Sequence, residues 1–445
     1  MKIETKMVET VLDNQALYSE DFLRVRDAVS NSKAIYKGQP VPYLYIPKIY
    51  DEADVETFKT ALSGMMDVVE RTIDLYMSDA SVRKLFGFDQ RLEELILLPH
   101  NYEVTVPMGR FDIFYYGPGD YKFCELNADG ASAMNEEKEL SAIMRKNAIV
   151  EAFESKYEFK VFELFHTWVK VLGDIYSSYS KNRGIELKPK ENTVVAIVDF
   201  IDKSSSIEFE VFKEAFIEQG YQCIIVDPRN IETVDGKMIA EGRVIDVIYR
   251  RLVTKDLMDR YDEIPGFILG LKAGETCVVG SVKTQIIHTK RFFEVLHTPE
   301  FRTYLNPAQL EFIDHHVPFT RPLDGSSDLK EYVSHKDELI IKPVDYYASK
   351  GVCAGRDYSE SDWATLIEEK SKEDFIIQSY CPLSLVDNVI YNEEGKLELR
   401  TFRTITGLFV YNGEFAGTYV RAGMNAIISG LHEGYTMSSM VVTEK

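Results

Sequence analysis

The chain has 445 residues and a formal net charge of −21, with 45% hydrophobic and 28% charged residues. This composition is typical of two to three folded domains or of one multi-lobed enzyme, and it argues against disorder. The strong acidity excludes non-specific binding to nucleic acid or to an anionic membrane, but it leaves room for a local basic pocket.

The N-terminal residues and the five cysteines predict a cytoplasmic protein. No apolar run approaches membrane-spanning length, and residues 1–14 lack the apolar segment of a signal peptide. The cysteines are scattered, which predicts free thiols in a reducing compartment rather than disulfides or a zinc site. We therefore expect no membrane partner and no nucleic-acid partner. The oligomeric state is left open.

Helices are predicted over most of the first 100 residues and again over residues 136–179. Between Val55 and Tyr76 the apolar residues recur at the spacing of one helix face. Between these regions, residues 101–132 predict two strands joined by the turn residues 117–119.

Polar residues alternate along this predicted hairpin. Arg110 and Asp112 share one face of the first strand, and Glu125 and Asn127 share one face of the second. We expect all four to project together. Two adjacent carboxylates repel each other, and magnesium would relieve that repulsion because carboxylate and amide oxygens suit it. The alternative is an ion-pair cluster on a solvated sheet face.

Strict alternation makes a second prediction for the same hairpin. Phe123 should lie on the face of Glu125, and Cys124 should lie on the opposite face.

A linker at residues 182–190 precedes alternating strands and helices. The predicted elements are strands at 194–198, 223–226 and 244–249 and a helix at 206–219. This order implies right-handed crossovers and an open α/β domain. Arg250 and Arg251 follow the third strand, where they meet either an anion or solvent.

A strand–loop–strand unit lies further along the chain. Lys342 stands near the end of the strand at 338–344, and the loop 345–351 contains Lys350 and Gly351. A lysine at a strand end and the N–H groups of a loop can together bind phosphates. From these residues alone, the simpler interpretation is an exposed hairpin with two ordinary lysines.

The last part of the chain predicts a two-residue hairpin turn at Asn412 and Gly413. Arg421 lies on the strand after this turn, among apolar and glycine residues. It is either a site residue or a member of a surface ion pair.

The run R-F-D, a hairpin, then E-L-N-A-D-G-A-S, from Arg110 to Ser132, resembles the R-x-D…E-x-N-A-D-x-A-S motif of glutathionylspermidine synthetases. Those enzymes are ATP-grasp ligases with a circularly permuted chain order. The resemblance covers most of residues 100–132 and 190–430 and implies an α/β fold of that type, with a small open α/β pre-ATP-grasp domain. Gly130 stands where the family has a serine that contacts glutathione, so glutathione itself is in doubt.

The resemblance also implies a division of the chain into four parts. These are 1–185, helices plus the metal-binding hairpin of the ATP-grasp C-lobe; 190–280, the pre-ATP-grasp substrate domain; 281–385, the nucleotide-binding lobe; and 386–445, the remainder of the C-lobe.

Each candidate site residue takes its role from the same resemblance. The implied magnesium ligands are Asp112, Glu125 and Asn127, and the implied catalytic residues are Arg110 and Arg421. The implied ATP contacts are Lys290, Lys342, Lys350, Gly351, Gln378, Ser379, Tyr380, Cys381 and Asn425. The implied substrate contacts are Ser132 and Arg250. The backbone of residues 378–381 would read the adenine edge, with Leu339 and Ile377 against the ring.

We therefore expect an ADP-forming ligase that joins a small-molecule carboxylate to an amine through an acyl phosphate, with ATP and Mg²⁺ as cofactors. The alternative is a non-catalytic relative that binds a nucleotide or a substrate. Retention of all four polar hairpin residues favours the enzyme. The sequence does not identify the acid or the amine.

Overall fold

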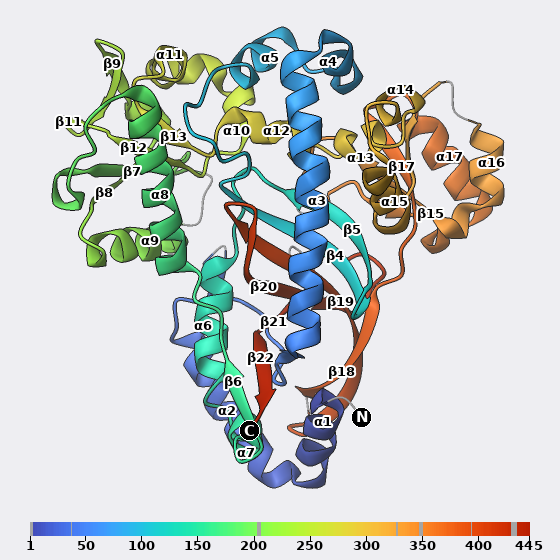
Figure 1. Ribbon diagram of the computed structural model, residues 1–445. Helices are drawn as coiled ribbons and strands as arrows, with labels where there is room; N and C mark the ends of the chain where they lie inside the picture. Colours follow the sequence, from blue (N-terminus) through green and yellow to red (C-terminus); the bar gives the residue numbers. More distant parts are fainter. Residues whose placement is uncertain are drawn as a thin grey trace.

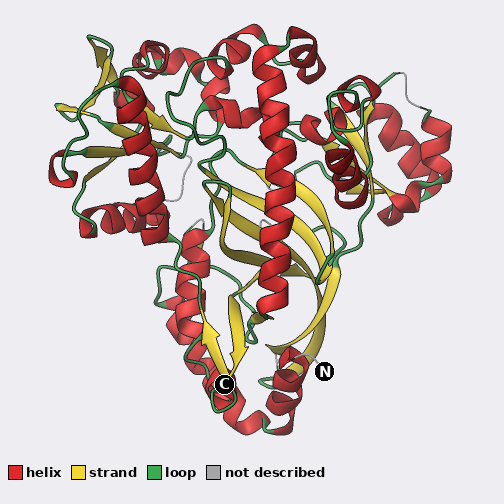
Figure 2. Cartoon of the chain, in the orientation of Figure 1, coloured by secondary structure: helices red, strands yellow, loops and turns green. Residues whose placement is uncertain are grey.

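The computed structural model describes residues 3–36, 38–202, 206–325, 328–346, 350–392, 394–428 and 434–445. Lobes built from different parts of the chain surround a central sheet, and both termini lie at the lower tip (Figure 1). Figure 2 shows that strands form the middle of the molecule and that helices cover the outside. Among the described segments, no helix combines the length and the apolar character needed to span a bilayer.

The central sheet is antiparallel and has the strand order β21-β20-β19-β4-β5, with β18 also paired to β19. Its strands are β4 (Met108–Gly117), β5 (Asp120–Asn127), β18 (Ser384–Tyr391), β19 (Leu397–Tyr411), β20 (Glu414–Gly423) and β21 (Tyr435–Met437). Both predicted hairpins form. Asn412 and Gly413 have φ values of 51° and 78°, as a type I′ turn requires.

A β-bulge shifts the pairing of β4 and β5 by one residue. Asp112 pairs with Glu125 but Ile113 pairs with Phe123, so Cys124 is the extra residue. The prediction from strict alternation is wrong for both neighbours: Phe123 is buried in the main core, and Cys124 lines a cavity on the other face.

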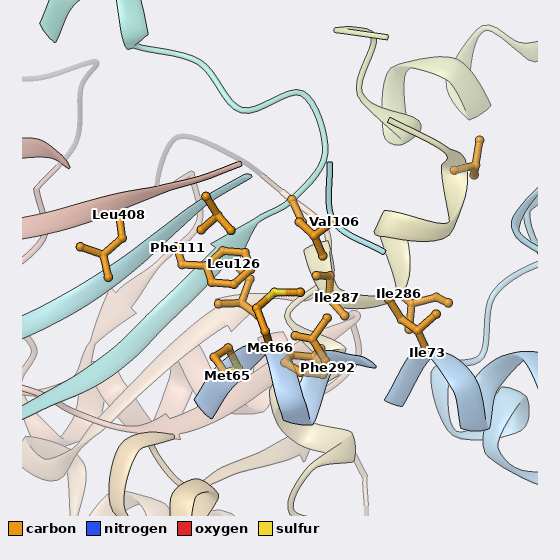
Figure 3. Packing of buried hydrophobic residues seen from close by; sticks show 14 of the residues in the cluster. Met65, Met66, Ile73, Val106, Phe111, Leu126, Ile286, Ile287, Phe292 and Leu408 are labelled. Carbon is orange, nitrogen blue, oxygen red and sulfur yellow. The ribbon is translucent and has the colours of Figure 1, made fainter. Parts of the chain in front are cut away.

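Helix α3 (Glu52–Ser78) covers one face of the central sheet (Figure 1). Figure 3 shows Met65 and Met66 of this helix packed beside Phe111 and Leu126 of the hairpin. The predicted apolar stripe of the helix is confirmed. Because the core occupies this face, the polar residues of the hairpin lie on the other one.

The α/β domain contains a parallel sheet in the order β13-β12-β7-β8, as the sequence predicts for an open α/β domain. Its elements are α8 (Phe165–Arg183), β7 (Val194–Val198), α9 (Ser206–Glu218), β8 (Gln222–Val226), β12 (Val247–Arg250), α10 (Thr254–Asp259), α11 (Pro265–Ala273) and β13 (Cys277–Val279). A small sheet of β9 (Glu232–Val234), β10 (Lys237–Ala240) and β11 (Arg243–Val244) was not expected, and Val244 belongs to it rather than to the third parallel strand.

A second lobe has the strand order β14-β17-β15-β16. Its elements are α13 (Arg291–Val295), α14 (Pro299–Arg302), α15 (Pro307–His316), β14 (Thr320–Leu323), α16 (Leu329–Ser334), β15 (Leu339–Pro343), β16 (Cys353–Ala354), α17 (Glu360–Lys370) and β17 (Phe375–Ser379). Trp363 and Ile367 of α17 bury one face of this sheet. Lys290 directly precedes α13.

The last strand, β22 (Ser439–Glu444), is inserted between β3 (Lys48–Tyr50) and β6 (Tyr157–Lys160). The remaining elements are α1 (Ile3–Asp13), α2 (Gln15–Ser30), β1 (Ile35–Tyr36), β2 (Gln39–Pro40), α4 (Ala80–Phe86), α5 (Gln90–Ile96), α6 (Met134–Met144), α7 (Ala148–Phe153) and α12 (Gln285–His288). The C-terminal strand is therefore tied into one sheet with two segments from the first part of the chain.

A buried ion pair joins the hairpin to the α/β domain. Asp129 accepts hydrogen bonds from the side chain of Arg250 and from the N–H of Thr254, and the two charged side chains are 0% and 1% exposed. Arg250 also donates to the carbonyls of Gly280 and Ser281. The guanidinium is thus committed within the protein, so the expected substrate contact of Arg250 is corrected to a structural role.

Asp129→Ala should lower the free energy of unfolding by about 3–5 kcal/mol, because it leaves the buried guanidinium of Arg250 without its charge partner. Glu275→Ala is the matched control, since Glu275 is the 42% exposed partner of Arg183. That change should cost less than about 1 kcal/mol. Urea denaturation measures both, and equally small losses would contradict the structural role of the pair.

Candidate functional site

The four polar residues of the hairpin lie on one face, as the sequence predicts. Arg110 pairs with Asn127 across the two strands, and Asp112 pairs with Glu125. The Asn127 amide nitrogen lies 3.3 Å from Asp112 Oδ2 and 3.2 Å from Glu125 Oε1. The hairpin therefore places two carboxylates around one amide.

Two arginines hold the buried carboxylate of Asp112. Arg110 Nε donates to Asp112 Oδ1 at 2.9 Å, and Arg421 Nη2 donates to Oδ2 at 2.6 Å. Burial opposes the charge on Arg110, but Asp112 more than compensates, so the pKa of that guanidinium lies above its usual value. Arg421 thus lies beside the hairpin carboxylates, in an ion pair with the buried Asp112. Its catalytic role stays a prediction.

Gly407 of β19 makes space for this ion pair, a role that the sequence analysis missed. It pairs with Asp112 across the strands, and a Cβ here would lie 2.6 Å from Asp112 Oδ1 and 2.7 Å from Arg110 Cδ. A glycine inside a long strand is the sequence signal for such a close approach.

Glu125 stands among basic side chains. Lys290 Nζ is 3.9 Å from Glu125 Oε2, and Arg421 Nη2 is 4.0 Å from Oε1. Burial acts to raise the pKa of Glu125, but Lys290, Arg421 and Lys342 together hold it well below its usual range. The carboxylate is therefore ionised at neutral pH.

A first cavity of about 70 Å³ lies between this face of the hairpin and the second lobe. Its charged lining residues are Lys290, Lys342, Lys350, Arg421 and Glu125. The described lining is thus rich in basic groups, although the whole chain carries −21. Such a pocket attracts an anion.

The second lobe presents one side of β15 to this cavity. Ile340 and Lys342 line it, together with Val352. Leu339 and Ile377 instead pack in the core of that lobe. The expected ring contacts of Leu339 and Ile377 are therefore wrong. Leu339 is three residues from Lys342, and Ile377 pairs with Ile341, so both side chains lie on the face opposite to that of Lys342.

The backbone at the end of β17 already forms hydrogen bonds within the second lobe. The N–H of Ser379 donates to Phe319 O at 2.9 Å, and that of Tyr380 donates to Glu338 O at 2.7 Å. These two N–H groups are thus unable to read an adenine edge as expected. The buried side chain of Gln378 instead accepts from Lys342 Nζ at 2.8 Å, which orients the lysine.

Several other expected nucleotide contacts do not line this cavity. These residues are Gly351, Cys381 and Asn425. Gly351 has a φ of 77° at the end of a loop whose residues 347–349 lie outside the described part of the chain. Asn425 is exposed, whereas the following residues 426–428 contribute to the wall. The nucleotide roles of these three residues stay predictions.

A second cavity, of about 610 Å³, shares Glu125, Tyr346, Arg421 and Ile428 with the first. It extends along the loop after β5, where the exposed Ser132 lines it, towards the α/β domain. The two cavities therefore meet beside the arginine–carboxylate cluster.

Gly130 in this loop is required by its backbone and its neighbours. Its φ is 63°, and an added Cβ would lie 2.5 Å from the carbonyl oxygen of Arg251. A serine here would be strained and would collide with the α/β domain. The wall of the second cavity therefore differs from one that has a serine at this position.

The donor set of the hairpin suits magnesium in composition: Asp112, Glu125 and the amide oxygen of Asn127. Among the described residues, no group of three or more His, Cys, Asp or Glu side chains could hold a metal ion. Arg421 already lies between the two carboxylates, at 2.6 and 4.0 Å. A cation bound to Asp112 must therefore displace this arginine from Asp112 Oδ2.

No protein-family profile and no curated protein matches the sequence. Among solved structures, a glutathione synthetase-like effector (GSS30) from Globodera pallida, in its apo form, aligns with a TM-score of 0.59 and 10% identity over 94% of this chain and 96% of that one. The chain has an ATP-grasp-type α/β fold.

Two synthetases align with lower scores. D-cycloserine synthetase DcsG and D-alanyl-alanine synthetase A from Vibrio cholerae have TM-scores of 0.30 and 0.27, each at 12% identity. They cover 56% and 57% of this chain, and 91% and 89% of their own. We draw no argument from them.

Gly407→Ala should destabilise the protein by about 1–3 kcal/mol, because the added methyl group pushes into the Arg110–Asp112 ion pair. Gly325→Ala is the control, since a Cβ there meets open space. Thermal melting compares the two variants. A Gly407→Ala protein as stable as the control would contradict the packing described for the site.

Proposed function

We propose that the protein is an ATP-dependent carboxylate–amine ligase that forms ADP and resembles glutathionylspermidine synthetases. The observation that supports this most is the basic first cavity, which meets a second cavity at Arg421. The chain order also suits a circularly permuted ATP-grasp protein, because the β4–β5 hairpin precedes the second lobe while its sheet partners β19 and β20 follow it.

In this proposal the first cavity takes the nucleotide. Lys290, Lys342 and Lys350 bind its phosphates, and Ile340 and Val352 contact the base. Asp112, Glu125 and Asn127 would hold Mg²⁺. When bound, that ion neutralises phosphate charge.

The reacting groups meet where the two cavities join. A substrate carboxylate reaches Arg110 and Arg421 from the second cavity, while the terminal phosphate of ATP reaches Arg421 from the first. The arginines stabilise the negative charge that develops on the acyl phosphate and on the tetrahedral intermediate. The protein needs no side-chain nucleophile, because the phosphate activates the carboxylate for attack by the amine.

A second candidate function is nucleotide binding without turnover. It is favoured by Arg421, which donates to Asp112 at 2.6 Å and so occupies a position that the proposed magnesium ion needs. A ligase requires this arginine to turn away when the cation and nucleotide bind, whereas a binding protein does not.

One assay separates the two candidates. The protein is mixed with ATP, Mg²⁺ and hydroxylamine, and a panel of amino acids and small peptides, glutathione included, supplies the carboxylate. Iron(III) detects the hydroxamate product, and a coupled assay measures ADP. The ligase gives both products in equal amounts with at least one carboxylate. Nucleotide binding by calorimetry with no ADP from any carboxylate supports the second candidate.

Lys342→Ala should weaken ATP binding by about 2–3 kcal/mol, the scale of a charge-assisted hydrogen bond. Lys372→Ala is the control, because that lysine is 71% exposed and remote from the cavity lining. Calorimetry measures both affinities. Equal affinities would contradict the assignment of Lys342 to the phosphates.

Arg110→Ala should keep near-normal ATP affinity and lose about 10²-fold or more in kcat, because its contact forms mainly in the transition state. Arg400→Ala, at a 41% exposed ion pair, serves as the control. Hydroxamate formation gives kcat and calorimetry gives the affinity. Lost ATP binding with unchanged kcat at saturating ATP would make Arg110 a nucleotide contact instead.

A further inference from the structure

The charge of the second cavity is opposite to that of the first. Its described acidic lining residues are Glu125, Asp129, Glu136, Asp199, Glu208, Asp256 and Asp345, and its basic ones are Arg110, Arg251, Lys255 and Arg421. A cavity with an acidic excess attracts a cation, and an alkylamine is a cation near neutral pH. Such an amine must lose a proton before its nitrogen can attack.

Most of these carboxylates are already engaged. Asp129 holds Arg250, and Glu208 accepts from Arg251 Nη2 at 2.6 Å and from the N–H of Asn135 at 3.1 Å. Glu136 differs, because its carboxylate accepts from its own backbone N–H and forms no hydrogen bond or ion pair with another residue in the described part of the chain.

The loop before α6 places Glu136 in the part of the second cavity that Arg110 lines. The carbonyl of Ser132 accepts from Arg110 Nη1 at 3.0 Å, and Ala133 then turns the chain with a φ of 81°. Glu136 follows in the first turn of α6 and lines the same cavity as Arg110. Its neighbour Glu137 is used differently, since it accepts from the N–H and hydroxyl of Ser439 at 2.9 and 2.8 Å.

The groups around the Glu136 carboxylate favour proton exchange near neutral pH. Burial and the negative charge of Glu208 raise the pKa of Glu136 to about 8, while Arg110 and Arg251 limit the rise. Tyr419 also faces it, with its ring 5.4 Å from the guanidinium carbon of Arg110. A group with such a pKa serves as an acid–base catalyst at cellular pH.

We propose that Glu136 is the residue that accepts the proton of the amine nucleophile. This inference rests on the proposed ligase function. The alkylammonium gives one proton to the Glu136 carboxylate and becomes the free amine. Its nitrogen then forms a bond to the acyl carbon and passes its second proton to the departing phosphate. The bond between the acyl carbon and the phosphate oxygen breaks, and inorganic phosphate leaves with the electron pair. The products are an amide, phosphate and a protonated Glu136, which then releases its proton to water.

Two nucleophiles of different basicity test the role of Glu136. Hydroxylamine is mostly unprotonated at neutral pH, whereas ethylamine and spermidine are mostly protonated. The carboxylate that gives the most hydroxamate with the unaltered protein is used throughout. Glu136→Gln should lose about 10²-fold or more of kcat with the alkylamine, the usual contribution of a general base, but should stay within about threefold with hydroxylamine.

Glu137→Gln is the matched control, because it changes the adjacent carboxylate of the same helix without touching the cavity. It should leave the ratio of the two rates unchanged. An equal loss with both nucleophiles in Glu136→Gln, no loss with either, or no amide from any alkylamine with the unaltered protein would overturn the inference. No hydroxamate from the unaltered protein would instead overturn the ligase function itself.

Discussion

The carboxylate of Asp112 is the constraint on which the site depends. It is fully buried and is bound by two arginines, Arg110 and Arg421, that come from different strands of the central sheet. One buried negative charge between two positive ones leaves an excess that is costly without a further anion. Glu125 lies 4.0 Å from Arg421 but is shared with Lys290 at 3.9 Å, so three positive side chains face two carboxylates. The remainder favours binding of a phosphate or a carboxylate beside the arginines.

The bulge at Cys124 lets one hairpin serve both the core and this cluster. In a regular strand, Phe123 and Glu125 would share a face, and either the phenyl ring would enter the site or the carboxylate would enter the core. The extra residue reverses the alternation between them, so Phe123 packs in the main core beside Phe312 of α15 while Glu125 remains beside Lys290. The bulge interrupts the pairing of β4 with β5, but it keeps the apolar core apart from the charged cluster.

Local patterns predicted much of this arrangement. Alternation grouped Arg110, Asp112, Glu125 and Asn127, and the turn residues predicted both hairpins, because these features depend on residues close in sequence. The bulge was missed because nothing in the sequence around Cys124 distinguishes it from a regular strand. The expected ring contacts Leu339 and Ile377 are each one residue away from a side chain on the face of Lys342, namely Ile340 and Gln378. One residue is enough to move a side chain to the opposite face.

Long-range contacts account for the other differences. Asp129 pairs with Arg250, and Gly407 leaves space for Asp112. Both contacts join segments that are far apart in the sequence and meet only in the folded chain. The same limit explains why the opposite charges of the two cavities could not be predicted. In the proposed ligase, the basic cavity would hold the phosphate donor and the acidic one the cationic nucleophile, on either side of Arg421. This separation opposes direct ion pairing of the two substrates away from the reacting atoms.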